Sequence, residues 1–401
     1  MKVLFVFSGI PPYMNALLNR LVDKGAEIIT VIPDKKSNQL GKGVKVTDGE
    51  KASYRVIEIN EKKSPAGKNQ FPRLSSIIEQ EIPDILVAGW PYFLQYFGDR
   101  KLRQSIRRNG VRFVIREIPF QVPPFGKNIA FFRQHPMYDE DMKLLSKGVA
   151  FFVRQWMVML VRRYCYSRAD GALAYASKGK IIMPTYGIDS NKVFVTFNTG
   201  DSEALLREKQ LLASEPPILP PNSRRIIHIG RLVKWKRVDL LIDSFAKVLR
   251  EFSDAELVVV GDGPERNTLQ QQAQTLGIEQ KILFTGGVHD PKTIGAYMSA
   301  SSLYVLAGMG GLSINDAMTY GLPVICSVCD GTEQDLISDK VNGLFFRENS
   351  ADDLSGKIAT LLRDPELKAK MGEASFRVIE EKINLESVSE RYLAAFTKIT
   401  S

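Results

Sequence analysis

The sequence is poor in cysteine and histidine. Its three cysteines, Cys165, Cys326 and Cys329, cannot form a disulfide framework, which favours a reducing cytosol over a secreted setting. Cys326 and Cys329 form a C-x-x-C pair, but a zinc site needs two further ligands at close spacing, and the histidines stand isolated at positions 135, 228 and 289. We therefore expect this pair to pack after a strand, and we expect no bound metal.

Long hydrophobic runs are also missing. No segment reaches the roughly 18 to 20 apolar residues that a membrane span requires. The N-terminal run from Met1 to Phe7 is too short for a signal peptide and is soon followed by Pro11 and Pro12, so we expect a buried strand there. These absences predict a cytoplasmic protein, with peripheral contact at the inner face of the cell membrane as an open alternative.

The nearest approach to a long apolar run is residues 149–161 (VAFFVRQWMVMLV), which Arg154 interrupts and Arg162 follows. Arginines beside Phe, Trp and Met suit a helix that lies in a membrane interface. They suit a helix buried between domains equally well. Both interpretations stay open at the level of the sequence.

Acidic residues are scarce in the first half of the chain. The 401 residues carry a net charge of +9, but residues 1–200 hold 31 lysines and arginines against 17 aspartates and glutamates, a net of +14. The second half holds 23 basic and 28 acidic residues, a net of −5. A basic first half indicates an anionic partner such as phospholipid head groups, a phosphorylated acceptor or nucleic acid, unless it is merely a well-solvated surface.

Short β-rich runs alternate with helical stretches in both halves, which predicts parallel strands covered by helices. In the first half, strands are expected at 2–7, 27–32, 85–88 and 112–115, with a helix at 14–24. In the second half, strands are expected at 225–229, 256–260, 282–285, 303–306 and 324–327, with helices at 238–251, 265–275, 291–299 and 313–320. This pattern is typical of doubly wound α/β sheets.

Four prolines in residues 211–223 (LLASEPPILPPNS) predict a linker between two domains. We expect a first Rossmann-like domain at residues 1–212 and a second at 213–384. Residues 376–400 are helical in pattern, and the helix at 385–401 is expected to pack back on the first domain.

The first of three turns with ligand-binding character follows the strand RIIHI and begins at Gly230. Ligands of doubly wound sheets bind at the carboxyl ends of the strands, where turns present backbone N–H groups to anions. Arg231 and Lys236 lie five positions apart on this turn. Together they suit a diphosphate, Arg as a bidentate fork and Lys as a point charge.

The second turn, Gly261-Asp262-Gly263-Pro264-Glu265, follows the strand ELVVV. Its G-x-G suggests a dinucleotide site, but the third glycine of that fingerprint is replaced by arginine at position 266. Helix initiation explains the proline and the glutamate equally well.

The third turn runs from Gly308 to Ser313 and contains Gly310 and Gly311. Three glycines within four positions let the backbone approach a ligand closely and offer several N–H donors. Ser313 is expected to cap the following helix. We predict ligand binding at this turn.

Together these strings resemble family-4 retaining glycosyltransferases of the GT-B fold, of the type found in bacterial polysaccharide and glycolipid biosynthesis. The resemblance rests on GRLVKWKRVDLLIDSF at 230–245, VVVGDGPERNTL at 258–269, ILFTGGV at 282–288 and GLSINDAMTYGLPVICS at 311–327, followed by Glu333. It is weaker in the first half, at SRADGALAYASKGK (167–180) and NTGD (198–201). The resemblance implies two Rossmann-like domains facing across a cleft, with a nucleoside-diphosphate sugar of UDP or GDP bound mainly by the second.

The resemblance also implies roles for individual residues. Arg231 and Lys236 would neutralise the donor diphosphate without a metal ion, as catalytic residues. The turn at 285–288 would contact the nucleotide base through backbone atoms. The turn residues expected to bind the donor are Gly9, Gly230, Gly263, Gly287, Val288, Gly310, Gly311, Leu312 and Ser313.

The E-x7-E motif of the family is altered in this chain. Asp316 stands at the second glutamate, the expected ribose ligand, and reaches one methylene less far. Gly308 stands at the first, which normally addresses the transferred sugar. Catalysis can rest on placing donor and acceptor on one face and on stabilising the charge of the diphosphate. Neither contribution requires that glutamate.

The first domain is expected to hold the acceptor, a glycan or a lipid-linked molecule. Candidate residues at its strand ends are Ser8 and Tyr13, Trp90, and Glu117, which stands where many relatives carry a histidine. The basic and aromatic stretch from Arg116 to Arg163 suits an acceptor at an anionic membrane.

Other functions remain open on the sequence alone. A strand followed by G-D-G and a helix also suits an NAD-dependent oxidoreductase, although the third glycine and a histidine at the hydride site are missing. The loss of glutamate at position 308 also fits a catalytically silent partner subunit. Sugar-nucleotide epimerisation leaves the basic half without a role, and nucleic acid is not expected as a partner.

Overall fold

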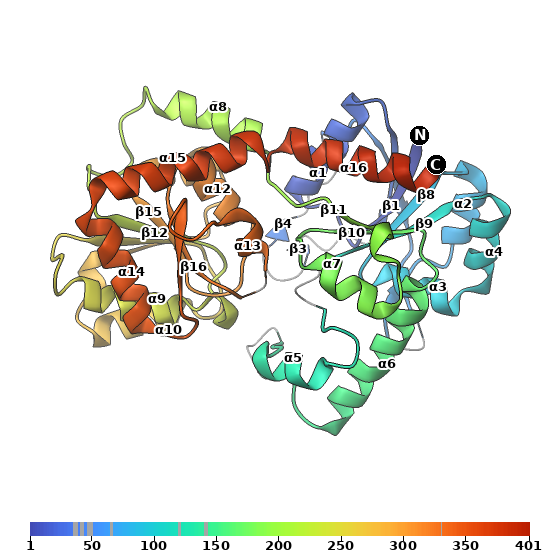
Figure 1. The fold of residues 1–401 in the computed structure, drawn as a ribbon, viewed down its shortest axis with the longest axis horizontal. Coiled ribbons are helices and arrows are strands. Elements are labelled where there is room, and N and C mark those ends of the chain that lie inside the picture. The colour runs from blue at the N-terminus through green and yellow to red at the C-terminus, as the bar shows by residue number, and fades with distance from the viewer. Residues whose placement is uncertain are drawn as a thin grey trace. The chain divides into compact units, whose positions relative to one another are not determined.

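The computed structural model describes residues 1–34, 39–40, 44–45, 51–64, 67–118, 122–139, 143–329 and 331–401. They form two compact units (Figure 1). The first contains Met1–Asn198 together with Leu385–Ser401, and the second contains Thr199–Asn384.

The first unit contains a seven-stranded sheet in the order β11-β10-β9-β8-β1-β2-β5, with every pairing parallel. Four of the strands lie where the sequence predicts them, and their near-continuous apolar runs suit a sheet covered on both faces. The strands are β1 (Lys2–Val6), β2 (Glu27–Pro33), β5 (Arg55–Ile59), β8 (Ile85–Gly89), β9 (Arg112–Glu117), β10 (Gly171–Ala174) and β11 (Val193–Val195). Two short antiparallel pairs accompany them: β3 (Gln39–Leu40) with β4 (Val44–Lys45), and β6 (Lys62–Lys63) with β7 (Asn69–Gln70).

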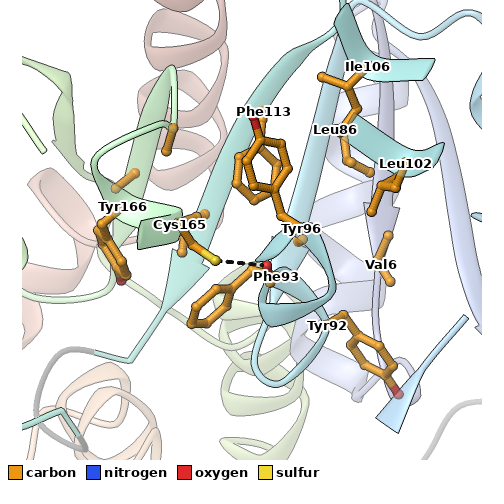
Figure 2. Close-up of a cluster of buried hydrophobic side chains, with 14 of the residues drawn as sticks. Val6, Leu86, Tyr92, Phe93, Tyr96, Leu102, Ile106, Phe113, Cys165 and Tyr166 are labelled. Carbon is orange, nitrogen blue, oxygen red and sulfur yellow. Dashed lines mark hydrogen bonds between the residues drawn. The ribbon is translucent and has the colours of Figure 1, made fainter. Parts of the chain in front are cut away.

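The helices of this unit are α1 (Pro12–Asp23), α2 (Leu74–Glu81), α3 (Gln95–Gly98), α4 (Arg100–Arg108), α5 (Asn128–Gln134), α6 (Val149–Tyr166), α7 (Gly179–Ile182) and α16 (Leu385–Thr400). The C-terminal helix α16 lies beside α1, where Glu386 pairs with Arg20 at 2.7 Å and also with Lys24 (Figure 1). The core on the other side of the sheet combines aliphatic side chains with several aromatic rings. Figure 2 shows Tyr96 stacked on Phe113, with 4.4 Å between ring centroids.

Helix α6 is buried mainly in its C-terminal part. Its C-terminal part buries Met159, Cys165 and Tyr166, whereas Val149 is 80% exposed and Met157 is 54% exposed. Figure 1 shows α5 and the N-terminal half of α6 extending beyond the sheet of their unit. Within the described part of the chain, no helix has the length and apolar character needed to cross a bilayer.

The second unit contains a six-stranded parallel sheet in the order β14-β13-β12-β15-β16-β17. All five predicted strands are confirmed, and β17 is an addition that the sequence pattern missed. The strands are β12 (Arg225–Ile229), β13 (Glu256–Val260), β14 (Ile282–Gly286), β15 (Leu303–Leu306), β16 (Val324–Ser327) and β17 (Gly343–Phe346).

Helices cover both faces of this sheet (Figure 1). One face carries α9 (Val238–Val248), α10 (Arg266–Thr275) and α14 (Ala351–Arg363), and the other carries α8 (Ser202–Leu212), α11 (Pro291–Ser299), α12 (Ser313–Thr319) and α15 (Pro365–Glu381). The short α13 (Thr332–Leu336) follows β16. The predicted doubly wound α/β class is therefore confirmed for both units.

The division between the units lies at Asn198, before the proline-rich stretch expected to link them. Helix α8 precedes those prolines, but it packs on α11 and α12 and so belongs to the second unit. Residues 213–224 contain no helix or strand and lie inside that unit, where the guanidinium of Arg225 donates to the carbonyl oxygen of Pro220 at 2.7 Å. Prolines signal irregular backbone, and that signal does not distinguish a loop from a linker.

Candidate donor site

The predicted turns of the second unit come together at one edge of its sheet. They follow β14, β13, β12 and β15, which are consecutive neighbours, and all four strands are parallel. Their carboxyl ends therefore meet at the same edge, which is where open α/β sheets bind ligands.

The turns after β12 and β13 pack backbone against backbone. The N–H of Leu232 donates to the carbonyl of Asp262 at 3.0 Å, and the N–H of Glu265 donates to the carbonyl of Leu232 at 3.1 Å. A Cβ at Gly263 would lie 2.4 Å from the Leu232 carbonyl oxygen, and one at Gly261 would lie 1.9 Å from that of Gly230. The G-x-G of this turn is thus explained by close packing on the neighbouring turn.

The turns after β12 and β15 are fastened together by Lys236. Its ammonium group donates to the carbonyl oxygens of Met309 at 2.8 Å and Gly310 at 2.6 Å. In the opposite direction, the N–H of Met309 donates to the carbonyl of Trp235 at 2.8 Å. Arg231 lies directly after Gly230 on the same turn and is partly exposed. The predicted cationic turn and the predicted glycine turn are therefore neighbours.

Gly308 occupies a position that leaves no room for a side chain. A Cβ there would lie 2.2 Å from the carbonyl oxygen of Trp235 and 2.7 Å from the carbonyl carbon of Lys236. Such distances do not occur in folded proteins unless the backbone moves. The missing glutamate at this position is therefore tied to the close approach of these two turns.

Asp316 lies in the first turn of α12, and burial raises the pKa of its carboxyl group to about 7. One carboxylate oxygen lies 3.3 Å from the place of a Cβ on Gly200, in the NTGD string of the sequence. Ser313 does not cap this helix as predicted. Its hydroxyl lies 2.7 Å from the hydroxyl of the buried Tyr304, and residue 312 is the N-cap.

Gly287 and Val288 follow β14 and adjoin the second turn. The N–H of Gly261 donates to the carbonyl of Gly286 at 2.9 Å, and a Cβ on Gly287 would contact Asp262 at 3.5 Å. All the predicted donor residues of the second unit thus lie on four adjoining turns or on the helix that follows them.

Sequence reasoning missed His228, which lies beneath these turns on β12. Its Nδ1 lies 3.0 Å from the carbonyl oxygen of Val305, and burial, aided by the charge of Lys236, lowers its pKa to about 4. The ring is therefore neutral, and Nδ1 carries the proton that this carbonyl accepts. In the sequence, His228 stands among the apolar residues of the strand RIIHI, and nothing there indicated that its side chain bonds to a neighbouring strand.

Glu333 holds the turn after β16. It is buried, and one carboxylate oxygen accepts from the N–H groups of Cys329 at 2.8 Å and Gly331 at 3.0 Å. Cys329 itself lies 3.2 Å from the hydroxyl of Ser327, and none of the described Cys, His, Asp and Glu residues cluster in a way that would hold a metal ion.

The candidate acceptor residues of the first unit also lie at neighbouring strand ends, since its sheet places β9, β8 and β1 side by side. Ser8 follows β1 and is exposed, and Tyr13 lies at the start of α1. Trp90 follows β8 and is 41% exposed, with the guanidinium of Arg162 and the ammonium of Lys68 each 4.9 Å from its ring.

Glu117, in contrast, is only 5% exposed and already has partners. Its two carboxylate oxygens accept from Arg162 at 2.6 and 3.1 Å, and the hydroxyl of Tyr166 donates to it at 2.7 Å. This carboxylate is bound within the fold, which favours a structural role. The residue before it, Arg116, lies on the opposite face of the sheet against Tyr175.

Residues 213–378 match the family described as glycosyl transferases group 1. This segment is a glycosyltransferase group 1 domain. Among curated relatives, the alpha-monoglucosyldiacylglycerol synthase of Streptococcus pneumoniae is 27% identical over 65% of this chain and 60% of its own length. The N-acetyl-alpha-D-glucosaminyl L-malate synthase of Bacillus anthracis is 31% identical over 42% of this chain and 43% of its own length. The chain thus spans about half the length of these relatives.

Solved structures match the whole chain. Anabaena HepE in complex with UDP has a TM-score of 0.69 at 17% identity, covering 99% of this chain and all of that one. A glycosyltransferase from Rickettsia africae has a TM-score of 0.69 at 16% identity, covering 99% of this chain and 98% of that one. Identity at this level shows the fold, which is that of the GT-B glycosyltransferases. The group 1 domain at residues 213–378 and the GT-B fold of the chain confirm the resemblance to glycosyltransferases of this fold.

Proposed function

We propose that this protein is a retaining, metal-independent glycosyltransferase. It moves a hexosyl group from a nucleoside-diphosphate sugar, with UDP or GDP as the nucleotide, to a glycan or lipid-linked acceptor in surface polysaccharide or glycolipid biosynthesis. The observation that carries the proposal is the joining of the cationic turn at 230–236 to the glycine turn at 308–312, at the carboxyl edge of a group 1 domain. The acceptor class is supported by similarity to an alpha-monoglucosyldiacylglycerol synthase and a lipopolysaccharide 1,6-galactosyltransferase.

In this proposal, Arg231 and Lys236 neutralise the donor diphosphate. Breaking the bond between the sugar and the diphosphate leaves additional negative charge on the departing nucleotide. Fixed positive groups stabilise that charge without reorganising, which lowers the barrier to transfer. Lys236 has a second task, since it also holds the glycine turn through two carbonyl oxygens.

The remaining donor contacts are assigned to backbone and to one carboxylate. The N–H groups of Gly310, Gly311 and Leu312 bind the phosphate or the sugar, and Asp316 accepts from the ribose hydroxyls. Gly287 and Val288 contact the base through backbone atoms, and Gly9, Gly230 and Gly263 allow close approach. Gly308 contributes only its small size, so sugar recognition that other family members obtain from a glutamate must come from elsewhere.

The decisive experiment measures binding of UDP, GDP and ADP by thermal shift and calorimetry, followed by transfer or hydrolysis with the matching sugar nucleotides. A ligand that binds the native state raises the apparent stability. We expect one nucleotide to bind clearly, and Arg231→Gln or Lys236→Gln to weaken it about 10- to 100-fold, the range for a charged hydrogen-bonding partner.

The matched control is Lys281→Gln. Lys281 is exposed and directly precedes β14, at the opposite edge of the same sheet, so its loss should leave affinity unchanged. Equal affinities in all three variants would contradict the proposal. Tight nucleotide binding without transfer or hydrolysis of any sugar nucleotide tested would instead identify a partner subunit. A preference for NADH would identify an oxidoreductase.

We assign peripheral membrane contact to the surface formed by α5 and residues 149–160 of α6. It exposes large apolar side chains at Ile129, Val149, Val153, Trp156, Met157 and Leu160. Arg154 lies among them, and Arg163 stacks on Phe125 at 4.6 Å. Apolar side chains beside arginines suit the interface of an anionic bilayer. The predicted stretch from 116 to 163 also contains 119–121 and 140–142, which lie outside the described residues.

Flotation with vesicles of phosphatidylcholine containing phosphatidylglycerol tests this surface. The double variant Met157→Ser, Leu160→Ser should lose most of its vesicle binding. A second double variant, Leu211→Ser with Val341→Ser, removes equally exposed apolar groups from the other unit and should bind like the parent. Binding that is absent in the parent at low salt, or equal in both variants, would refute the membrane assignment.

A further inference from the structure

The first unit buries Arg116 and Arg162 at the carboxyl edge of its sheet, and among the residues that the structure describes only Arg162 has a carboxylate partner. Arg162 is paired with Glu117 through two hydrogen bonds. Arg116 is 8% exposed, and no ion pair joins it to any acidic residue in the described parts of the chain. An arginine stays charged in proteins, so this buried positive charge has no counter-charge there.

Aromatic and polar groups surround the Arg116 guanidinium. Its Nε donates to the hydroxyl of Tyr392 at 3.0 Å, and one terminal nitrogen lies 2.8 Å from the sulfur of Met14. The ring of Tyr175 lies 4.4 Å from the guanidinium carbon, and that of Phe7 lies 5.8 Å away. Aromatic faces offset part of the desolvation cost of a cation, but they do not neutralise it.

This cluster sits where a parallel sheet binds ligands. Phe7, Arg116 and Tyr175 lie at or directly after the carboxyl ends of β1, β9 and β10. The twelve-residue helix α1 begins beside them at Pro12, with no side-chain cap and no acidic residue in its first turn. A helix N-terminus carries partial positive charge, which adds to that of Arg116.

Hydroxyl donors adjoin the cation. The hydroxyls of Tyr13 and Tyr175 lie 3.5 Å apart, and burial raises the pKa of Tyr175 well above its usual value, so this hydroxyl keeps its proton. Ser8 is exposed and Tyr13 is partly exposed, so the cluster adjoins the surface of its unit. Positive charge, phenolic donors and an uncapped helix start together favour an anion.

We propose that Arg116, Tyr13 and Tyr175 form a binding site for a phosphate group on the acceptor. This proposal rests on the proposed glycosyltransferase function and deepens it, because it gives the acceptor a chemical class. The guanidinium supplies the counter-charge and the tyrosine hydroxyls donate hydrogen bonds to the phosphate oxygens. The net charge of +14 in residues 1–200 draws anionic acceptors toward the same unit.

The test is calorimetric titration of the full chain with inorganic phosphate at low ionic strength, with the preferred nucleoside diphosphate present at saturation. The nucleotide fills the donor site, so the measured binding reports a second site. We expect Arg116→Gln to reduce phosphate affinity at least tenfold, Tyr175→Phe to reduce it several-fold, and Arg116→Lys to retain part of it. Tyr164→Phe, a matched change on a ring that packs on Phe97 in the same unit, should have no effect.

Nucleotide affinity serves as the readout that separates the two proposals. If no nucleotide binds the parent protein, the proposed function fails, whatever phosphate does. If nucleotide binds normally but phosphate does not, or if Arg116→Gln and Tyr175→Phe bind phosphate like the parent, the acceptor site is refuted. If Arg116→Gln fails to fold, Arg116→Lys and Tyr175→Phe decide the outcome.

Two soluble probes then distinguish the sources of the phosphate. Dihexanoyl-phosphatidic acid represents a lipid headgroup, and glucose 6-phosphate represents a phosphorylated sugar. The probe that binds more tightly than inorganic phosphate, with the gain lost in Arg116→Gln, identifies the acceptor type. A gain that survives this substitution for both probes would contradict the assignment of the site to Arg116.

Discussion

The carboxyl edges of the two sheets are built by different means. In the second unit the edge is made of backbone, because glycines let the turns after β12, β13 and β15 pack directly on one another. In the first unit the corresponding edge is made of large side chains, with two buried arginines and several tyrosines. A backbone-built edge suits a ligand part that never changes, such as a diphosphate, whereas a side-chain-built edge can be changed residue by residue to suit different acceptors.

This contrast matches the sequence resemblance. The family resemblance is specific in the second half, where the turns pack so closely that only glycine fits at several positions. It is weak in the first half, where large side chains form the edge. We therefore expect substitutions at the two edges to affect stability and binding differently.

The largest effect is expected from comparing the two buried arginines. Arg162→Met leaves Glu117 buried without its partner and should lower the free energy of unfolding by about 3–5 kcal/mol. Arg116→Met removes a buried charge that has no carboxylate partner among the described residues, and its effect should be less than half as large. Urea unfolding of both variants measures the difference. Equal losses would show that Arg116 is as structural as Arg162.

The next effect tests the backbone-built edge through Gly308. Gly308→Ala places a Cβ against the carbonyl oxygen of Trp235, and should cost about 2–4 kcal/mol of stability and weaken nucleotide binding. Gly356→Ala, in helix α14 with nothing within 4 Å, should stabilise by about 0.5–1 kcal/mol. Thermal and urea unfolding, with nucleotide titration, give both readouts. A stable Gly308→Glu variant with raised transferase activity would show that this turn has room for the family's glutamate after all.

The smallest effect concerns pH and the carboxyl group of Asp316, which lies in the first turn of α12. Because burial raises the pKa of Asp316 to about 7, the carboxylate that we propose to accept from the ribose forms only near and above neutral pH. Nucleotide affinity should therefore fall about tenfold from pH 8 to pH 6, as expected for a required group of that pKa. The Asp316→Asn variant, measured over the same pH range, should lose this fall in affinity. It should keep only the pH dependence that comes from ionisation of the nucleotide. Identical pH profiles for the two proteins would contradict the role of Asp316.

The same shift has a stability consequence of known sign. A carboxyl group whose folded pKa is raised binds its proton more tightly in the folded state, so its contribution to stability decreases as pH rises from about 4 to about 7. Asp316→Asn should flatten this part of the stability profile. Urea unfolding across that range checks the prediction, independently of any ligand.

The sequence by itself determined the local architecture of this protein. Apolar runs such as ELVVV and RIIHI predicted strands, and the glycines after them predicted turns at the ligand-binding edge. These signals are readable because strand periodicity and the conformational freedom of glycine depend on neighbours along the chain. The fold class followed from them, whereas the family was identified by the resemblance of longer strings such as GLSINDAMTYGLPVICS at 311–327.

Only the tertiary structure decided which side chains meet. It paired Glu117 with Arg162, left Arg116 with Tyr175 and Tyr392, and placed the Lys236 ammonium on the carbonyls of the third turn. Arg116 and Tyr392 are 276 positions apart, and no local pattern links residues at that distance. It also assigned α8 to the second unit, because packing partners, and not prolines, define a domain. Burial, and with it the charge state of Asp316, depends on contacts that form only when the whole unit has folded.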